Sequence, residues 1–265
     1  GQNFVADPNT VRRIAALARV GPGDRVVEIG AGLGSLTLAL ADTGAHVIAV
    51  EVDRGVVPVL RDVVAHLDNV AVVEGDAMQL DWSNLLGADP GWVLVANLPY
   101  NVATPLICDL LDDVPVIERM IVMVQREAAE RFAAAPRTAQ YGAVSVKTAY
   151  WATAQIVGQV PASVFVPRPN VESSLVEITR RPPPPTDPEA LFALVRTAFG
   201  QRRKMLRRSL AGVIAPATFD AAGISPTARP EELDVAAWCR LTDAHLAAGA
   251  ATDPRPTQDP RPLEK

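Results

Sequence analysis

Four consecutive residues, Asn97-Leu98-Pro99-Tyr100, follow the apolar run WVLVA and combine groups suited to chemistry on an aromatic amine such as that of adenine. Such an amine is a poor nucleophile because its lone pair is delocalised into the ring. The amide oxygen of Asn97 and the backbone carbonyl of Leu98 can accept its two hydrogens and draw the nitrogen toward tetrahedral geometry. Pro99 stiffens the turn, and Tyr100 offers a ring to stack on a flipped base. The alternative is an ordinary strand-to-helix turn that uses Asn and Pro for capping.

Three acidic residues accompany a glycine-rich turn, GAGLG at 30–34, that lies upstream. Glu28 precedes the turn, while Glu51 and Asp76 end two later apolar runs. A dinucleotide site also combines a glycine turn with a later acid, but Ser35 stands where its fingerprint requires a third glycine. A carboxylate at Glu28 would repel a pyrophosphate and attract the ammonium and sulfonium of S-adenosylmethionine. We therefore expect S-adenosylmethionine, with Asp76 accepting from its adenine amine or, alternatively, acting as a helix cap.

Apolar runs of strand length alternate with helical segments from 25 to 125, which predicts a parallel sheet covered by helices on both faces. The expected strands are RVVEIG, HVIAVE, VAVVEG, WVLVAN and MIVMVQ. Residues 8–20 predict a helix capped by Asp7, with Pro8 at its first position. Two later β-rich stretches, 143–160 and 173–180, predict an antiparallel pair that closes the sheet edge. The fold class is thus α/β, a Rossmann-like methyltransferase sheet followed by a small all-helical domain.

Composition excludes several other classes of protein. In 265 residues with 49% apolar side chains, there is enough material for a full core and a second, smaller unit. The sequence contains neither an uncharged apolar run of about 18 residues nor a basic start followed by an apolar run, so we expect a cytoplasmic protein without a membrane span or signal peptide. Cys108 and Cys239 lie far apart among apolar residues and predict buried free thiols. The three histidines are scattered, and no metal site is expected.

A local run of basic residues contrasts with the net charge of −5. Segment 196–208 reads RTAFGQRRKMLRR and contains no acid. Solvated helix faces normally mix charge signs, so we expect contacts with RNA phosphates from Arg202, Arg203, Lys204 and Arg207. The alternative is a solvated helix face. Arg126 is a further candidate, although local ion pairs with Glu127 or Glu130 compete equally.

Four successive prolines in RRPPPPTDP, at 180–188, fix an extended backbone and predict a domain boundary. We expect a cofactor-binding catalytic domain over 1–181 and a linker at 182–188. A helical RNA-binding domain would follow at 189–249, with breaks at Pro216, 223–226 and Pro230. The Pro-rich segment 250–265 is expected to be a flexible tail.

These motifs together resemble the KsgA-type ribosomal RNA adenine dimethyltransferases, and the resemblance extends from Gly1 to about Leu246. It is carried by GQNFV at 1–5, the glycine turn, Glu51, GDA at 75–77, NLPY at 97–100, QRE at 125–127, VFVPRP at 164–169, RRK at 202–204 and RPEEL at 229–233. It implies that Asn3 and Val5 touch the methionine end of the cofactor, that Glu51 holds the ribose hydroxyls, and that Phe165 stacks on the target base opposite Tyr100. Without the family, Phe165 would be assigned to the core. The cofactor-binding candidates are Gln2, Asn3, Val5, Glu28, Gly30, Gly32, Glu51, Asp76, Ala77 and Asn97.

The resemblance further implies dimethylation of two adjacent adenines in the 3′-terminal hairpin of small-subunit RNA, within an assembling 30S particle, with S-adenosylhomocysteine as product. A monomer is the simplest expectation. The nearest rival is the related Erm group, which acts on large-subunit RNA. Further rivals are a DNA adenine methyltransferase, whose tetrapeptide usually has proline where Leu98 stands, a non-catalytic assembly factor that binds pre-ribosomal RNA, and a nicotinamide oxidoreductase.

Overall fold

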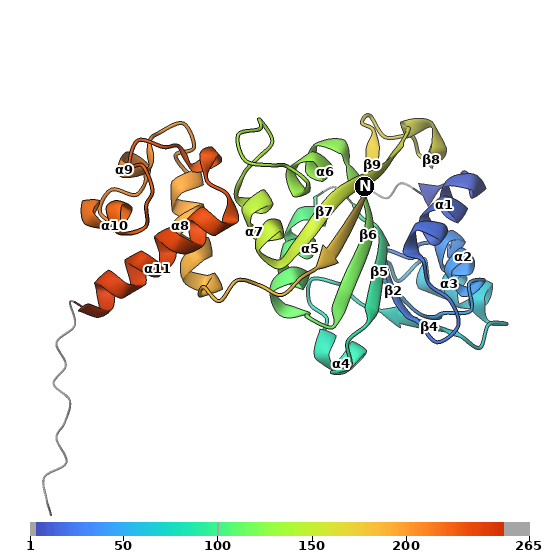
Figure 1. Cartoon of the computed structure of the whole chain (residues 1–265). Helices are drawn as coiled ribbons and strands as arrows, with labels where there is room; N and C mark the ends of the chain where they lie inside the picture. The colour runs from blue at the N-terminus through green and yellow to red at the C-terminus, as the bar shows by residue number, and fades with distance from the viewer. Residues whose placement is uncertain (1–3, 100, 252–265) are drawn as a thin grey trace, which may run out of the picture. The chain divides into compact units, whose positions relative to one another are not determined.

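The computed structural model describes residues 4–99 and 101–251, which belong to two compact units, Gly1–Pro183 and Pro184–Lys265 (Figure 1). Within the described residues, none of the helices combines the length and the apolar character needed to cross a membrane.

The first unit is built on a seven-stranded sheet with the order β4-β3-β2-β5-β6-β9-β7. The five strands β4, β3, β2, β5 and β6 are parallel, and β9 and β7 extend the sheet as an antiparallel pair, as predicted. The strands are β2 Arg25–Ile29, β3 His46–Glu51, β4 Val70–Glu74, β5 Trp92–Asn97, β6 Ile117–Gln125, β7 Ala152–Val160 and β9 Ser173–Arg180. The predicted α/β fold class is confirmed.

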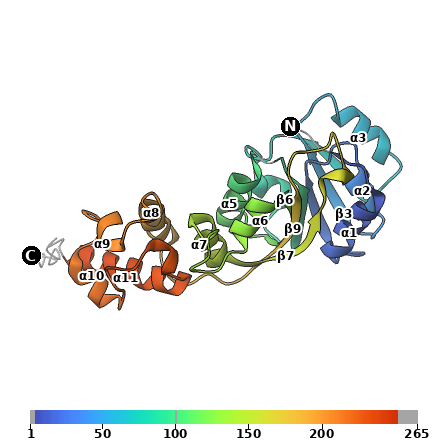
Figure 2. The same cartoon turned by 90° about the horizontal axis from the view of Figure 1, so that it is seen from above.

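Helices cover both faces of this sheet (Figure 2). One face carries α1 Pro8–Ala18, α2 Ser35–Ala41 and α3 Val57–Val64, and the other carries α4 Trp82–Leu86, α5 Ala103–Asp113, α6 Arg126–Phe132 and α7 Ala143–Trp151. Successive residues of the central strand β5 point to opposite cores: Val93 and Val95 pack with α1 and α2, whereas Leu94 and Ala96 pack with α5. A strand that is buried on both faces has a continuous apolar sequence. The run WVLVA therefore predicts β5.

Helix α1 begins as predicted. Asp7 is its N-cap, and the carboxylate accepts hydrogen bonds from the backbone N–H groups of Asn9 and Thr10 at 3.3 and 2.9 Å. The hydrogen bond from the Thr10 hydroxyl, followed by those from the two backbone N–H groups, lowers the pKa of Asp7. Pro8 occupies the first turn, where its missing N–H costs nothing.

The prediction of β structure over 143–160 was wrong for its first half, because 143–151 forms helix α7. Val144, Val146, Thr148 and Tyr150 alternate with smaller or polar residues, which is typical of a strand. Tertiary packing overrides this propensity, because Val146 and Tyr150 are fully buried and the helix packs on α5 and α6. Ser145 anchors the first turn by accepting from the N–H of Gly142 and donating to the carbonyl of Arg131.

Arg180, at the end of β9, ties the sheet to the C-terminus of α5. Its guanidinium donates to the carbonyls of Leu110, Leu111, Val114 and Ile117 at 2.9–3.2 Å. The last carbonyls of a helix lack the N–H partners of the next turn, and the guanidinium supplies a donor to the carbonyl of Leu111. It adds a second, charged donor to the carbonyls of Leu110 and Val114, which already accept from the backbone N–H groups of Val114 and Ile117. Burial lowers the pKa of Arg180.

A second, two-stranded sheet was not predicted. Strand β1 (Phe4–Val5) pairs antiparallel with β8 (Phe165–Val166), which follows the short helix η1 (Ala162–Val164). The register places Phe4 opposite Val166 and Val5 opposite Phe165, and the N–H of Ala6 donates to the carbonyl of Val164 at 2.8 Å. We refer to β1 and β8 together as the β1–β8 ribbon.

The second unit is helical in its described part. It contains α8 Pro188–Phe199, α9 Leu206–Ser209, α10 Pro216–Ala221, η2 Pro230–Glu232 and α11 Val235–Ala251. Trp238 is completely buried at its centre, and its ring lies 6.1 Å from that of Phe199. The breaks fall close to the predicted positions, although Pro216 and Pro230 begin the next helical segments, where their fixed φ is favourable.

Both cysteines are free thiols, as predicted. Cys239 is buried, and Cys108 is half-buried in α5, where burial raises the pKa of its thiol to about 11.

Candidate functional site

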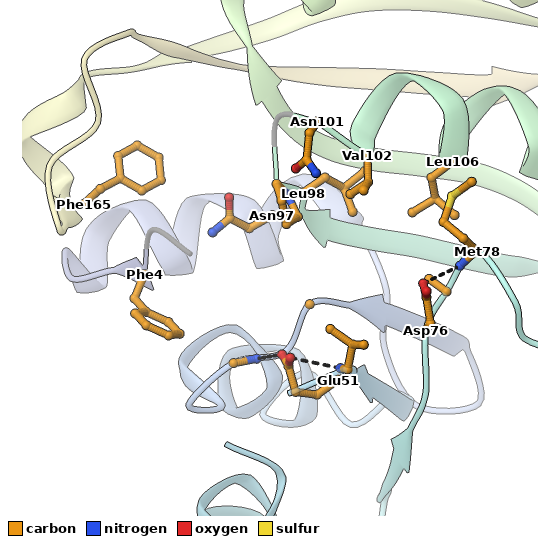
Figure 3. Close-up of a pocket in the computed structure, with 15 residues that line it drawn as sticks. Phe4, Glu51, Asp76, Met78, Asn97, Leu98, Asn101, Val102, Leu106 and Phe165 are labelled. Carbon is orange, nitrogen blue, oxygen red and sulfur yellow. Dashed lines mark hydrogen bonds between the residues drawn. The ribbon is translucent and has the colours of Figure 1, made fainter. Parts of the chain in front are cut away.

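The candidate site lies at the carboxyl ends of the parallel strands, at the point where the strand order reverses. Strand β2 lies between β3 and β5, so the chain segments that leave β2 and β5 diverge and open a crevice. Two adjoining cavities of about 310 and 400 Å³ occupy it, and both are lined by Phe4, Gly30 and Asn97. Figure 3 shows the residues that line the smaller cavity. We call the smaller one, which also contacts Glu51 and Asp76, the first cavity, and the larger one, which contacts Glu28, the second cavity.

The glycine turn brings bare backbone to the first cavity. Gly30 has φ +77°, and a Cβ added there would lie 3.3 Å from the carbonyl oxygen of Asn97. Gly32 has φ +56°, and a Cβ there would lie 2.9 Å from the ring of Phe4. Both positions therefore require glycine for conformation and for close approach.

Glu51, at the end of β3, is buried and firmly held. One carboxylate oxygen accepts from the N–H of Gly32 at 2.8 Å, and the other accepts from the N–H groups of Val52 and Asp53 at 3.0 and 2.9 Å. A carboxylate oxygen has two lone pairs, so Oε2, which accepts from Gly32, can accept a further hydrogen bond from a ligand at the cavity wall. The three hydrogen bonds fix the orientation of the Glu51 carboxylate before a ligand binds.

Glu28, in β2, is 1% exposed and contacts the second cavity. Burial raises its pKa to about 7, the hydroxyl of Thr37 opposes the shift by donating at 2.5 Å, and the nearby charge of Glu51 adds to it. Desolvation of a carboxylate is offset when a cation is close. The second cavity is therefore suited to a positively charged group.

Asp76 and Ala77 follow β4 and line the first cavity. The carboxylate of Asp76 accepts from the N–H of Met78 at 3.0 Å and from the side chain of Gln79 at 3.2 Å. The next helix, α4, is capped by Asp81. Asp76 thus closes a local turn, and it is half-buried at the cavity, so the capping alternative describes only part of its environment.

The tetrapeptide turn follows β5 directly. Asn97 lines both cavities, and Leu98 and Pro99 line the first. Leu98 is held by its N–H, which donates to the carbonyl of Met123 at 3.2 Å, whereas its own carbonyl accepts no hydrogen bond from the residues that the structure describes. The carbonyl of Pro99 accepts from Val102 and Ala103. Tyr100 lies outside the described residues, as do Gln2 and Asn3.

Phe165 is both a core residue and a cavity residue. Its side chain is 3% exposed, and it contributes to the wall of the first cavity. Figure 3 places the rings of Phe165 and Phe4 on the same side of Asn97, away from Asp76 and Met78. Val5, the partner of Phe165 in the β1–β8 ribbon, lines the second cavity.

The basic candidates lie elsewhere. Arg126 lines neither cavity, and its guanidinium pairs with Glu172 at 3.2 Å and with Glu130 at 3.7 Å. In the second unit, Arg202 pairs with Glu231 at 2.6 Å. The segment that carries the remaining cations forms turns up to α9, so the continuous helix face considered as the alternative is absent from this part of the structure. Arg203, Lys204 and Arg207 are exposed.

The electrostatic character of the two cavities distinguishes the candidate cofactors. Glu28, Glu51 and Asp76 contribute carboxylates, and no Lys, Arg or His of the described ranges 4–99 and 101–251 lines either cavity. A pyrophosphate would meet only repulsion from these side chains, whereas a cationic nucleoside finds complementary charge. The residues present therefore fit S-adenosylmethionine.

Sequence reasoning assigned no role to several residues that line the first cavity. These are Phe4, Val52, Met78, Asn101, Val102 and Leu106. Val52 and Met78 were identifiable from their positions, because Val52 follows Glu51 and Met78 lies two residues after Asp76. Asn101 adjoins the tetrapeptide.

Comparisons with known proteins agree with this geometry. The family model described as ribosomal RNA adenine dimethylase matches residues 1–245. Ribosomal RNA small subunit methyltransferase A of Cutibacterium acnes is 48% identical, covering 96% of this chain and 90% of that protein. The corresponding protein of Kineococcus radiotolerans is 46% identical, covering 98% and 89%.

Two solved structures share the fold. A dimethyladenosine transferase from Plasmodium falciparum has a TM-score of 0.81 and 22% identity, covering 93% of this chain and 98% of that chain. The 23S rRNA methyltransferase ErmE has a TM-score of 0.67 and 28% identity, covering 91% and 99%. The fold is the Rossmann-like sheet of class I S-adenosylmethionine-dependent methyltransferases. The chain belongs to the ribosomal RNA adenine dimethylase family.

Proposed function

We propose that this enzyme transfers methyl groups from S-adenosylmethionine to the exocyclic amines of two adjacent adenines in the 3′-terminal hairpin of small-subunit ribosomal RNA. The observation that carries the proposal is the position of Asn97, which borders both the acid-lined cavities and the aromatic wall formed by Phe165. The identity of 48% to a small-subunit methyltransferase, against 28% to ErmE, supports the small subunit over the large one.

The cofactor would be held by groups at consecutive strand ends. Glu51 accepts from the ribose hydroxyls, Asp76 and Ala77 receive the adenine, and Gly30 and Gly32 allow close approach of the backbone. Glu28 and Val5, with Gln2 and Asn3, receive the methionine end. When bound, the cofactor supplies a methyl group already activated by a sulfonium, so the site needs neither a metal nor a strong base.

The turn after β5 would prepare the nucleophile. The amide oxygen of Asn97 and the backbone carbonyl of Leu98 accept the two amine hydrogens and localise the nitrogen lone pair. Pro99 stiffens the turn, and Phe165 and Tyr100 hold the extruded base by stacking. Catalysis is then mainly positioning of the amine in line with the methyl group.

The second unit would supply sequence-independent RNA contacts. Exposed Arg203, Lys204 and Arg207 are available to phosphates, whereas Arg202 and Arg126 must first leave carboxylate partners. We assign catalysis to 1–181, a linker to 182–188, RNA binding to 189–249 and a flexible tail to 250–265. We further propose a cytoplasmic monomer that acts on assembling 30S particles.

The test is transfer of labelled methyl groups to small-subunit particles that lack the modification and, in parallel, to large-subunit particles, followed by digestion of the RNA. Asn97→Ala is expected to abolish transfer while leaving cofactor affinity nearly unchanged. Asn84→Ala, which removes an exposed amide in α4, is the matched control and should retain full activity.

Each outcome has a separate meaning. Label found only in large-subunit RNA would reject the substrate in favour of an Erm-like activity. Binding of the particles without any transfer would indicate a non-catalytic assembly factor. Full activity of Asn97→Ala would reject the proposed role of the turn.

A further inference from the structure

Asn101 is a second amide at the first cavity. Its side chain is exposed and contributes to the same wall as Asn97, Leu98 and Phe165. In Figure 3 the Asn101 amide is directed toward Leu98 and Asn97. The two amides thus approach one region of the cavity from the same turn.

The usual structural reason for an Asn at this position does not apply. An Asn just before a helix normally caps it by accepting from a backbone N–H of the first turn. Helix α5 has Val102 as its N-cap and no side-chain capping hydrogen bond, and the N–H groups of Val102 and Ala103 donate to the carbonyl of Pro99. Over 4–99 and 101–251, no hydrogen bond of the Asn101 amide is present. The amide is therefore available to a ligand.

The chemistry of the cavity wall indicates which ligand atom it would meet. The polar side chains of this wall in the described residues are Glu51, Asp76, Asn97 and Asn101. Ionised carboxylates can only accept hydrogen bonds, and Asn97 is proposed to use its oxygen on the amine. Adenine also presents two ring nitrogens beside that amine, N1 and N7, and both are acceptors that require a donor.

We propose that Asn101 donates its Nδ2–H to one of the two ring nitrogens that flank the target amine, and so orients the base toward Asn97 and Leu98. This inference rests on the proposed function. The hydrogen bond fixes the rotation of the base in its plane, which stacking by Phe165 alone leaves free. With the ring held, both amine hydrogens can face their acceptors together.

The experiment combines wild type and three protein variants with three RNA substrates. Small-subunit particles are reconstituted with RNA whose target adenines are unmodified, 1-deazaadenine or 7-deazaadenine, each deaza base lacking one of the two ring acceptors. Wild type and Asn101→Ala are compared by kcat/KM for methyl transfer, with Asn84→Ala as the control for a lost amide outside the site. Cofactor affinity and thermal unfolding are measured on wild type and on all three variants to verify that they are folded.

For wild type, one of the two analogues is expected to lower kcat/KM about tenfold more than the other, as for a single lost hydrogen bond. Asn101→Ala should lose about tenfold on the unmodified RNA and nothing further on that analogue. The analogue that matters identifies the ring nitrogen. Asn101→Asp, which keeps the shape but offers no N–H, should behave like Asn101→Ala.

Full activity of Asn101→Ala on unmodified RNA would overturn the inference. It would also be overturned if both analogues lowered wild type and Asn101→Ala by equal factors, since Asn101 would then act independently of the ring nitrogens. Absence of transfer by wild type to unmodified particles would instead reject the proposed function itself, so the two failures are distinguishable.

Discussion

Substitution of Glu28 by Gln tests how strongly the fold penalises a buried charge. The side chain is 1% exposed, and burial raises its pKa from an ordinary 4.5 to about 7, against the opposing hydrogen bond from Thr37 and with a further increase from the charge of Glu51. Gln preserves the shape and can still accept from Thr37, but it carries no charge at any pH.

The sign and size of the effect follow from proton linkage. Between pH 4.5 and 7 the folded protein retains a proton that the unfolded chain has released, so the free energy of unfolding falls as pH rises through this window. The shift corresponds to about 3 kcal/mol, fully lost above pH 7 and fully regained below pH 4.5. Relative to wild type, Glu28→Gln should therefore gain about 3 kcal/mol of stability between pH 4.5 and pH 8.

The assay is urea unfolding of both proteins without cofactor, at half-unit steps from pH 4.5 to 8.5. Glu118→Gln, which removes an exposed carboxylate of β6, is the control and should follow the pH profile of wild type. A difference between Glu28→Gln and wild type that stays constant across this range would refute the reasoning, because it would show that Glu28 loses its proton equally easily in both states.

Three further changes have defined outcomes. Gly30→Ala and Gly87→Ala both place Ala at positive φ, and each should lose about 1–2 kcal/mol in urea unfolding. Only Gly30→Ala, whose Cβ meets the backbone carbonyl of Asn97, should also lose methyl transfer, because Gly87 has open space around it. Arg180→Ala should cost about 3 kcal/mol in the same assay because four carbonyls lose a charged donor, and an effect below 1 kcal/mol would contradict this role. Arg203→Ala should reduce the slope of log K for RNA binding against log salt concentration by about 0.9. Arg202→Ala should reduce this slope by less, because Arg202 is already paired with Glu231. Equal slopes for the two variants would contradict the assignment of Arg203 to a phosphate.

The parallel part of the fold was predictable because its signals are local. Strands β2, β3 and β5 are buried on both faces, so their sequences are mainly apolar, with Glu28 as an acidic residue inside β2. Each strand leads into a polar or glycine-rich turn. The acids at these strand ends could be placed at one edge of the sheet because parallel strands point the same way. Glu28, Glu51, Asp76 and Asn97 accordingly lie around the two cavities.

What could not be predicted depends on contacts between distant segments. Helix α7 has a strand-like sequence, and it is helical because its buried side chains pack against α5 and α6. Segment 196–208 contains no acid, so its sequence showed no sign of an ion pair. Arg202 nevertheless pairs with Glu231, because the later segment that carries Glu231 folds back against it. Asn101 carries no pattern of its own, and only the absence of a capping role in the folded chain reveals it.

The β1–β8 ribbon couples the positions of two segments that lie far apart in the sequence, because each strand is hydrogen-bonded to the other. One strand carries Phe4, whose ring lies against Gly32 of the glycine turn, and the other carries Phe165, which lines the same cavity, so each strand supports the aromatic side chain of the other. Removal of β1 would consequently displace Phe165 first, although this residue lies in the second half of the sequence. An affinity tag or a deletion at the amino terminus is thus expected to lower the rate of methyl transfer more than the affinity for the cofactor.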